Sequence, residues 1–396
     1  MLRTLALALL LVIVLPLVGL VVRPLDAERF FGPKPAANAG LRSLPDDVRA
    51  RHDALFVADL HADPLLWSRN LLKRSTRGHL DIPRMIDGGL DLQLFMAVTD
   101  APFDSSGEAI PRGFDQTGLL AALDHWPFRT WASPRERALY MAARLQGFAA
   151  GSKHRFQVIT TRDQLAAYRQ KRESGERSAA GVLGIEGAEP LEGSVGNLDS
   201  LFAAGYRVMG LAHYWDSAMS GSSSGVQKPG LTAEGRRAVG RMEQLGMTVD
   251  VAHASERATL DVLDMARRPI LASHVGVRSI CAHSRNLSDA VIDRIAANGG
   301  VIGIGFFPEV TCGRGLDAVV RSILYVRNRV GAEHVALGSG FDAPVDVPID
   351  ALGLAELTAA LEGASIPSSE IRLIMGENVY RILMQNLPPA PGTGGA

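Results

Sequence analysis

Residues 55–63 read LFVADLHAD, an apolar run that ends in a histidine and an aspartate two positions apart. In an extended strand, residues two apart face the same side. His61 and Asp63 can therefore present a nitrogen and an oxygen to one metal ion. The run predicts a buried strand with two candidate metal ligands at its carboxyl end.

Eight similar β-prone runs follow, most of them separated by stretches with helical periodicity. They are LQLFMAV (92–98), FQVIT (156–160), VLGIE (182–186), YRVMGLA (206–212), MTVDVA (247–252), PILAS (269–273), GVIGIGF (300–306) and HVALGSG (334–340). Apolar strands without clean alternation are typical of a parallel sheet covered by helices on both faces. About eight such units favour a closed (β/α)8 barrel of the TIM type, although a doubly wound open sheet shows the same alternation.

The composition indicates a globular protein with no general affinity for nucleic acid. Hydrophobic residues make up 47% of the 396 residues and charged residues 21%, which is enough apolar material for a large core. The 41 basic and 42 acidic side chains leave no overall positive field. Because no low-complexity break interrupts the middle of the chain, we expect one barrel domain over residues 51–387.

The two ends of the chain have a different character. Leu5 to Val22 carries no charge, and a helix of that length covers about 27 Å, close to the hydrocarbon core of a bilayer. Residues 1–25 are therefore expected to be a hydrophobic helix that acts as a transmembrane anchor, or alternatively a cleaved signal segment. Residues 26–50 would be a tether and residues 388–396 a flexible tail, with the catalytic domain on the periplasmic or extracellular side.

Several of the later runs also end at a polar residue. Glu186, His213, His253 and His274 lie at the ends of the fourth, fifth, sixth and seventh runs, and the carboxyl ends of barrel strands meet at one rim. A lone histidine after a strand is usually structural, but this conjunction gives a nitrogen and oxygen ligand set suited to zinc. The five candidate ligands are His61, Asp63, Glu186, His253 and His274.

Five ligands exceed the needs of one tetrahedral ion with an open position. Two ions bridged by a carboxylate explain the number better, and Glu186 is the natural bridge because a carboxylate can give one oxygen to each metal. The remaining histidines have no ligand partner at useful spacing and receive no predicted role; they are His52, His79, His125, His154, His283 and His334. Cys281 and Cys312 form no metal-binding spacing and are either buried free thiols or a disulfide.

Together these motifs resemble the membrane (renal-type) dipeptidases, zinc peptidases of the amidohydrolase-like barrel class. The segments that carry the resemblance are DLHADPL (59–65), GIEGAEPL (184–191), LAHYWDS (211–217), LGMTVDVAHAS (245–255), PILASHVGVRSICAHSRNLSD (269–289), GSGFDAP (338–344) and MGENVYRIL (375–383). The resemblance implies two zinc ions per subunit and hydrolysis of dipeptides by a metal-bridged hydroxide. A homodimer is also possible.

The resemblance also implies roles for individual residues. His61 and Asp63 would bind one zinc, His253 and His274 the second, and Glu186 both. His213 and Arg285 would bind the substrate, the histidine at the tetrahedral intermediate and the arginine at the dipeptide carboxylate. Cys281 and Cys312 match a family disulfide.

One position departs from the family pattern. The family reads GxDFDG near the last strand, and its first aspartate accepts a proton from the attacking water. Here Gly340 occupies that place, and Asp342 is the only nearby substitute, displaced by about 6–7 Å along a strand. Loss of such proton transfer typically costs about 10²–10⁴-fold in rate.

Three functions therefore stay open. The first is a zinc dipeptidase. The second is a membrane-tethered protein that binds metal or peptide and has weakened or lost catalysis. The third is a related hydrolase acting on other amides or on lactones.

Overall fold

A computed structural model describes residues 24–37, 44–105 and 107–390 of the chain. All nine apolar runs form strands in it: β1 Ala58–Ala62, β2 Leu92–Val98, β3 Phe156–Val158, β4 Ala179–Glu186, β5 Tyr206–Gly210, β6 Thr248–Asp250, β7 Leu271–Val275, β8 Val301–Ile304 and β9 Val335–Leu337. Eight of them pair side by side in the order β2, β1, β9, β8, β7, β6, β5, β4, and a parallel β2–β4 pairing closes the ring. The strands thus form the closed parallel barrel that the sequence predicts, and β3 adds to the edge of β4.

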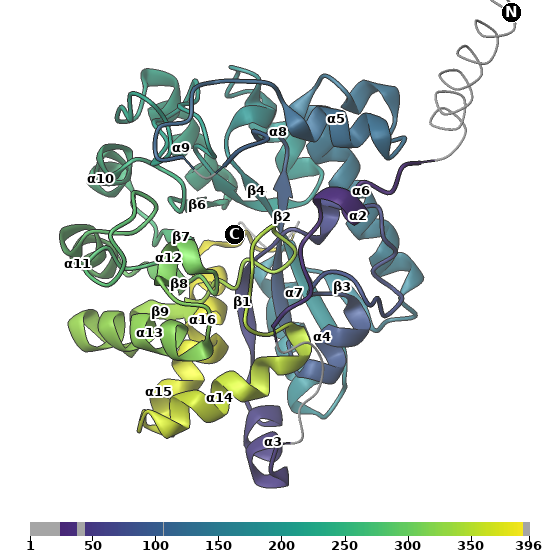
Figure 1. Ribbon diagram of the computed structural model, residues 1–396, viewed down its shortest axis with the longest axis vertical. Coiled ribbons are helices and arrows are strands. Elements are labelled where there is room, and N and C mark those ends of the chain that lie inside the picture. The colour runs from purple at the N-terminus through teal and green to yellow at the C-terminus, as the bar shows by residue number, and fades with distance from the viewer. Residues whose placement is uncertain (1–23, 38–43, 106, 391–396) are drawn as a thin grey trace, which may run out of the picture.

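Helices surround this barrel (Figure 1). They are α2 Glu28–Phe31, α3 Asp46–Asp53, α4 Ile82–Gly88, α5 Gln116–Leu123, α6 Pro134–Gly151, α7 Arg162–Glu173, α8 Asn197–Ala203, α9 Ala233–Leu245, α10 Glu256–Met265, α11 Asp289–Ala297, α12 Pro308–Thr311, α13 Leu316–Val330, α14 Leu354–Gly363, α15 Ser368–Arg372 and α16 Asn378–Asn386. Strand, helix and strand alternate along most of the chain, as parallel pairing requires.

Both faces of the strands are buried. In β2, Leu92, Leu94 and Met96 pack with residues of other strands in one apolar cluster, whereas Phe95 and Ala97 belong to the larger cluster that includes the helices. Residues two apart share a face, so one set fills the barrel and the other holds the helices. This explains why the strands read as continuous apolar runs.

The segment predicted to be a tether is packed against the barrel where it is described. The backbone N–H of Leu25 donates to the carbonyl of Leu123 at 3.0 Å, and that of Ala37 donates to the carbonyl of Val347 at 3.1 Å. Glu28 is buried and forms an ion pair with Arg69. Residues 26–37 are therefore part of the folded domain, because a buried charge pair and backbone bonds hold them there.

The predicted anchor and tail lie almost wholly outside the described residues. Within the described ranges, no helix combines the length and apolar composition that a bilayer crossing requires. At the other end, the N–H of Ala390 donates to Asp163 at 2.6 Å, so the first residues of the predicted tail contact α7.

Candidate metal centre

The predicted ligands converge at the carboxyl ends of the strands. Glu186, the last residue of β4, lies at the centre: its Oε1 is 2.7 Å from Nε2 of His253, 3.1 Å from Nε2 of His274 and 3.9 Å from Nε2 of His61. Asp63 follows β1 and places Oδ1 3.2 Å from the same His61 nitrogen. All five side chains are buried, so the barrel rim brings together the whole predicted set.

Two groups of these side chains have a geometry that could hold a metal ion. One consists of His61, Glu186 and His274, and the other of Glu186, His213 and His253; the ligand atoms of each group lie within 4.8 Å of one another. Glu186 belongs to both groups, as a bridging carboxylate must. The division of ligands differs from the expected one: His274 groups with His61, and His213, expected to bind substrate, groups with His253. Asp63, expected to bind the same ion as His61, belongs to neither group.

The charge state of these residues also suits a cation. Burial would raise the pKa of Glu186, but the neighbouring His213, His61 and His253 hold it well below the usual value, so this carboxylate is charged. Burial keeps the pKa values of His253 and His274 well below the usual one. These imidazoles are therefore neutral, the form that binds metals.

His61 differs from the other imidazoles. Burial lowers its pKa, but the carboxylates of Asp63 and Glu186 raise it to about 9. Oδ1 of Asp63 faces Nε2 of His61 at 3.2 Å without completing a hydrogen bond. A divalent cation would replace the His61 proton and engage that oxygen, so the donor set fits a metal pair.

A second layer of polar residues fixes the ligands. Ser273 donates its hydroxyl proton to Asp250 at 2.5 Å, and its Oγ lies 2.9 Å from Nδ1 of His274. Such outer partners set the orientation of a ligating imidazole. Asp250 and Ser273 had no predicted role, although Asp250 lies three residues before the predicted ligand His253 and Ser273 directly before His274.

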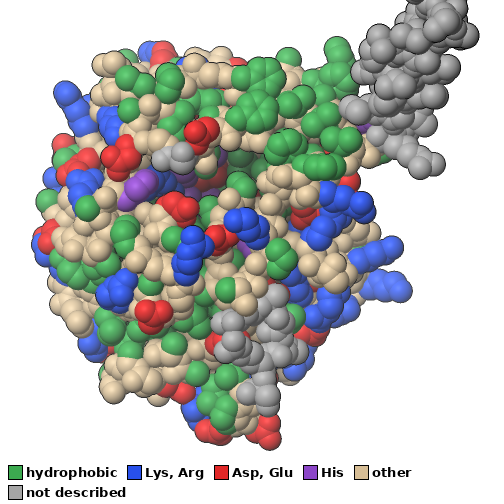
Figure 2. Space-filling model, viewed as in Figure 1, with side chains coloured by type: hydrophobic (Ala, Val, Ile, Leu, Met, Phe, Trp, Pro, Cys, Tyr) green, Lys and Arg blue, Asp and Glu red, His purple; other side chains and the backbone are tan. Residues whose placement is uncertain are grey.

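The centre opens into a cavity of about 460 Å³. Figure 2 shows histidine and acidic side chains inside a hollow on this face of the molecule. Arg285 and Tyr214 contribute polar wall, and the apolar wall includes Phe31, Trp67, Phe103, Leu120 and Phe307. The cavity therefore combines one polar floor with broad hydrophobic sides.

Tyr214 is a wall residue with no predicted role. Its ring contacts the rings of His213 and His253 at centroid distances of 4.1 and 5.5 Å. Burial, with the nearby charge of Glu186, raises its pKa to about 12, so the hydroxyl keeps its proton. The position directly after His213 in LAHYWDS was the only sequence signal for it.

Arg285 reaches the centre from the loop after β7. Its Nη2 lies 2.9 Å from Nε2 of His274, and its Nη1 donates to the carbonyl of Ala252. Burial lowers the pKa of this guanidinium, yet arginine stays protonated at neutral pH. The side chain therefore places a positive charge on the wall of the cavity.

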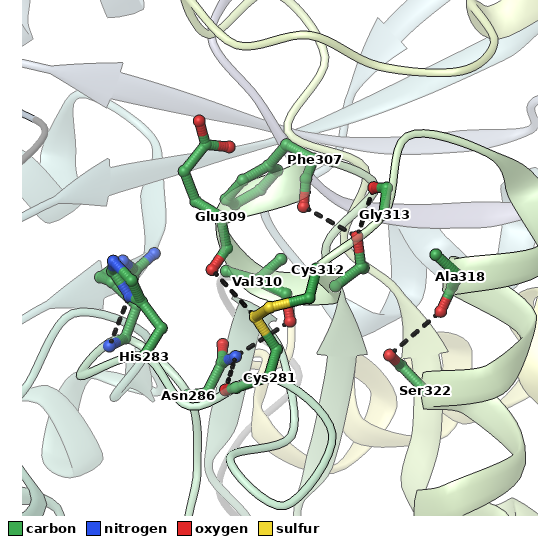
Figure 3. The surroundings of a disulfide bond; sticks show 12 residues. Cys281, His283, Asn286, Phe307, Glu309, Val310, Cys312, Gly313, Ala318 and Ser322 are labelled. Carbon is green, nitrogen blue, oxygen red and sulfur yellow. Dashed lines mark hydrogen bonds between the residues drawn. A yellow bond between two sulfur atoms is a disulfide. The ribbon is translucent and has the colours of Figure 1, made fainter.

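A disulfide holds the Arg285 loop in place (Figure 3). Cys281 and Cys312 are bonded to each other, which confirms the predicted pairing. Between them, the Asn286 amide donates to the carbonyls of Cys281 and Val310 at 2.8 and 2.9 Å. The loop after β7 is thus fixed to α12 directly beside Arg285.

Gly340 lines the cavity, and Asp342 does not. The Asp342 carboxylate forms an ion pair with Arg69 and accepts the backbone N–H of His79 at 2.6 Å. Its side chain is fully buried among these partners. These contacts hold the carboxylate outside the cavity, so Asp342, the only nearby substitute for the missing acid in the sequence, does not stand at the metal centre.

Glu189 is a half-buried acid near the centre whose carboxylate oxygens are buried, and it had no predicted role. Neither of its carboxylate oxygens has a hydrogen-bond partner among the described residues. Burial raises its pKa to about 8, and the charge of Asp100 adds to the shift. The side chain therefore lowers the stability of the fold whenever it is ionised.

The substitution Glu189→Gln is expected to weaken the pH dependence of stability. The folded-state pKa of about 8 lies above the unfolded value of roughly 4.3. At low pH the side chain is protonated in both states and costs no stability. As the pH rises toward 8, the unfolded state loses the proton first, so the free energy of unfolding falls. The loss is at most about 1.4 kcal/mol per pH unit. In urea unfolding at pH about 5 and about 9, the free energy of unfolding of the variant should rise relative to that of the parent as the pH rises.

The exposed Glu192, which follows in the same segment, offers a matched control. Glu192→Gln makes the same chemical change at the surface, and its unfolding is measured at the same two pH values. A stability difference between the Glu189→Gln variant and the parent that stays constant with pH would contradict the assignment of a raised pKa.

Comparison with known proteins agrees with this geometry. The family model described as membrane dipeptidase (peptidase family M19) matches residues 46–387. Dipeptidase tcpJ of Claviceps purpurea is 35% identical over 221 residues, which are 52% of this chain and 51% of that protein. The aligned part thus spans about half the length of this curated relative.

Two solved structures show the same fold. A probable dipeptidase, PvdM from Pseudomonas aeruginosa, superimposes with a TM-score of 0.72 at 20% identity, covering 86% of this chain and 98% of that one. A metallopeptidase from Rhodobacter sphaeroides superimposes with a TM-score of 0.68 at 24% identity, covering 84% and 99%. Because the family match extends over the whole barrel, this chain belongs to the membrane dipeptidase family, peptidase family M19.

Proposed function

We propose that this protein is a dipeptidase that holds two zinc ions at the barrel rim. The observation that carries the proposal is the position of Glu186, which lies between two groups of histidines at the floor of one cavity. Zinc ions held there would polarise the peptide carbonyl and lower the pKa of the attacking water. Nitrogen and oxygen ligands without sulfur are consistent with zinc.

The substrate class follows from the walls of the cavity and from a relative. The Rhodobacter sphaeroides metallopeptidase carries a phosphinate mimic of the dipeptide L-Ala-D-Ala. In this chain Arg285 would bind the substrate carboxylate through its planar fork, which selects short peptides with a free C-terminus. His213, with Nε2 3.3 Å from Glu186, would lie beside the scissile bond.

The direct test measures zinc content and turnover together. The purified protein, supplied with zinc, should hold two ions per chain and hydrolyse members of a dipeptide panel. A protein that binds two ions and hydrolyses none would support a binding protein instead, which Gly340 favours because no carboxylate stands at that position. A protein that hydrolyses amides or lactones without a free carboxylate equally well would support the third function.

Arg285→Lys should separate dipeptides from substrates without a carboxylate. Lysine keeps the charge but loses the fork, and a charge-assisted hydrogen bond is worth about 1.5–3 kcal/mol. We expect kcat/KM for a dipeptide to fall by roughly tenfold to a hundredfold, mostly through KM. The C-terminal amide of the same dipeptide is the control, and an equal loss for both substrates would mean that Arg285 is only structural.

We further propose that residues 1–25 anchor the protein, with the barrel on the periplasmic or extracellular side. The uncharged run from Leu5 to Val22 supports the anchor. The Cys281–Cys312 disulfide supports an oxidising compartment. Fractionation of expressing cells, followed by protease treatment of intact cells or spheroplasts, tests both points.

A further inference from the structure

The exposed aromatic side chains of the described residues are concentrated in two segments. Large hydrophobic side chains are exposed at Phe30, Phe31, Phe103, Phe114, Phe128, Trp131 and Val226, with 81% exposure at Phe128 and 67% at Phe30. All except Val226 are aromatic and lie at 30–31 or within 103–131. We call these six aromatic residues the aromatic patch. Single exposed apolar residues are ordinary, but a concentration of them marks an interaction surface.

Packing brings the two segments together. The backbone N–H of Leu25 donates to the carbonyl of Leu123, and that of Ala27 donates to Asp124 at 2.7 Å, so the chain leading into α2 lies against the end of α5. Figure 2 shows hydrophobic side chains gathered on the upper right of the molecule, in the region of α2 and α5 in Figure 1. The segment of Phe30 and Phe31 and the segment of residues 103–131 therefore lie side by side, although they are distant in the sequence.

The patch also borders the entrance to the metal centre. Phe31 and Phe103 both belong to the patch and line the cavity. Phe103 stacks on Phe114 with ring centroids 5.6 Å apart, and Phe128 contacts Trp131 at 5.1 Å. A partner that covers the patch would lie at the mouth of the active site.

The charges around the patch do not indicate a strongly charged partner. Arg29 and Arg129 are exposed next to Phe30 and Phe128, but each forms an ion pair, with Asp26 and Glu136 respectively. The two charges next to the most exposed rings are therefore neutralised by acidic partners. The patch suits a hydrocarbon or interfacial environment better than an ionic one.

The sequence indicates which apolar environment is near. The uncharged run ends at Val22, and Phe30 follows eight residues later, a length of chain that reaches at most about 29 Å. A bilayer that holds the run must therefore lie close to the patch. Aromatic side chains are favoured where lipid headgroups meet hydrocarbon.

We propose that the aromatic patch rests in the interfacial region of a lipid bilayer, so that the cavity opens at the membrane surface. This inference goes beyond the proposed peptidase activity, and it rests on the proposed membrane anchor. The membrane would cover the Phe128 and Trp131 side and leave the opposite end of the barrel in water. Substrates would then enter along the lipid surface.

Tryptophan fluorescence of the full chain in phosphatidylcholine vesicles tests the proposal. Trp131 is 40% exposed, whereas Trp67, Trp126 and Trp215 are buried. The difference in fluorescence emission between the parent and Trp131→Phe is therefore the emission of Trp131. In vesicles whose lipids are brominated near the glycerol end of the acyl chains, we expect the bromine to quench the emission of Trp131. Phe128→Ser should weaken the quenching and leave dipeptide turnover unchanged, because Phe128 lies outside the cavity lining.

A tryptophan at the other end of the barrel is the matched control. Tyr380 in α16 contacts Phe56, which precedes β1, and so lies opposite the metal centre. Tyr380→Trp in the Trp131→Phe background should stay bright in brominated vesicles. Equal Trp131 emission in both kinds of vesicle, or equal quenching at position 380, would overturn the proposal. Protection of Trp131 from acrylamide that depends on protein concentration in detergent would also overturn it, because a second copy would then cover the patch.

Discussion

Glu186→Gln is expected to abolish binding of the metal pair and to lower kcat/KM by about 10³-fold or more. The carboxylate belongs to both groups of ligands, and its pKa is held well below the usual value by three histidines, so it supplies the negative charge at the centre. A neutral amide keeps the shape but not the charge. Loss of roughly 4 kcal/mol of transition-state stabilisation corresponds to that rate effect.

The matched control for this substitution lies three residues away. Glu189→Gln makes the same chemical change at a carboxylate whose oxygens are buried and which belongs to neither group of ligands. It should keep two ions per chain and most of the activity. Elemental analysis and dipeptide turnover of both variants check the prediction, and metal retained at full stoichiometry in Glu186→Gln would contradict the bridging role.

Gly340→Asp is expected to raise kcat by about 10²–10⁴-fold, the range typical of a positioned proton acceptor. Gly340 lies on the cavity wall, and its N–H donates to the carbonyl of His61 at 3.2 Å. A carboxylate at this position would therefore stand beside His61 and Asp63. The parent should be a slow enzyme for lack of this group. Single-turnover measurements with a dipeptide would separate the chemical step from binding.

The backbone and one neighbour limit this substitution. Gly340 has a φ of +73°, and a Cβ there would lie 2.9 Å from Cδ1 of Phe307. Aspartate tolerates this backbone region better than most residues, and Phe307→Leu in the same protein would give the side chain room. Gly340→Asn has the same shape without the base, so equal gains from Asn and Asp, or no gain from either, would contradict the proton-transfer argument.

Much of the fold could be predicted because the barrel buries both faces of each strand. All nine apolar runs became strands, and the five predicted ligands meet because the carboxyl ends of parallel strands share one rim. Local sequence is sufficient for such features. The disulfide was implied by the family resemblance and not by spacing.

The contacts of Asp342 could not be predicted, because its partners are remote in sequence. Arg69 lies 273 residues away, and it also pairs with Glu28 in the N-terminal segment. His79 received no predicted role, yet its N–H holds the same carboxylate. The Pro, Ala and Gly content around residue 35 indicated a tether, whereas the buried Glu28–Arg69 pair holds this segment on the barrel.

Anomalous diffraction at the zinc absorption edge, from crystals of the zinc-loaded protein, tests the central claim most directly. The account predicts two peaks, both beside the Glu186 carboxylate. One should lie near His61 and His274, and the other near His213 and His253. One peak, no peak, or peaks that Glu186 does not contact would contradict a bridged metal pair and, with it, the proposed hydrolysis.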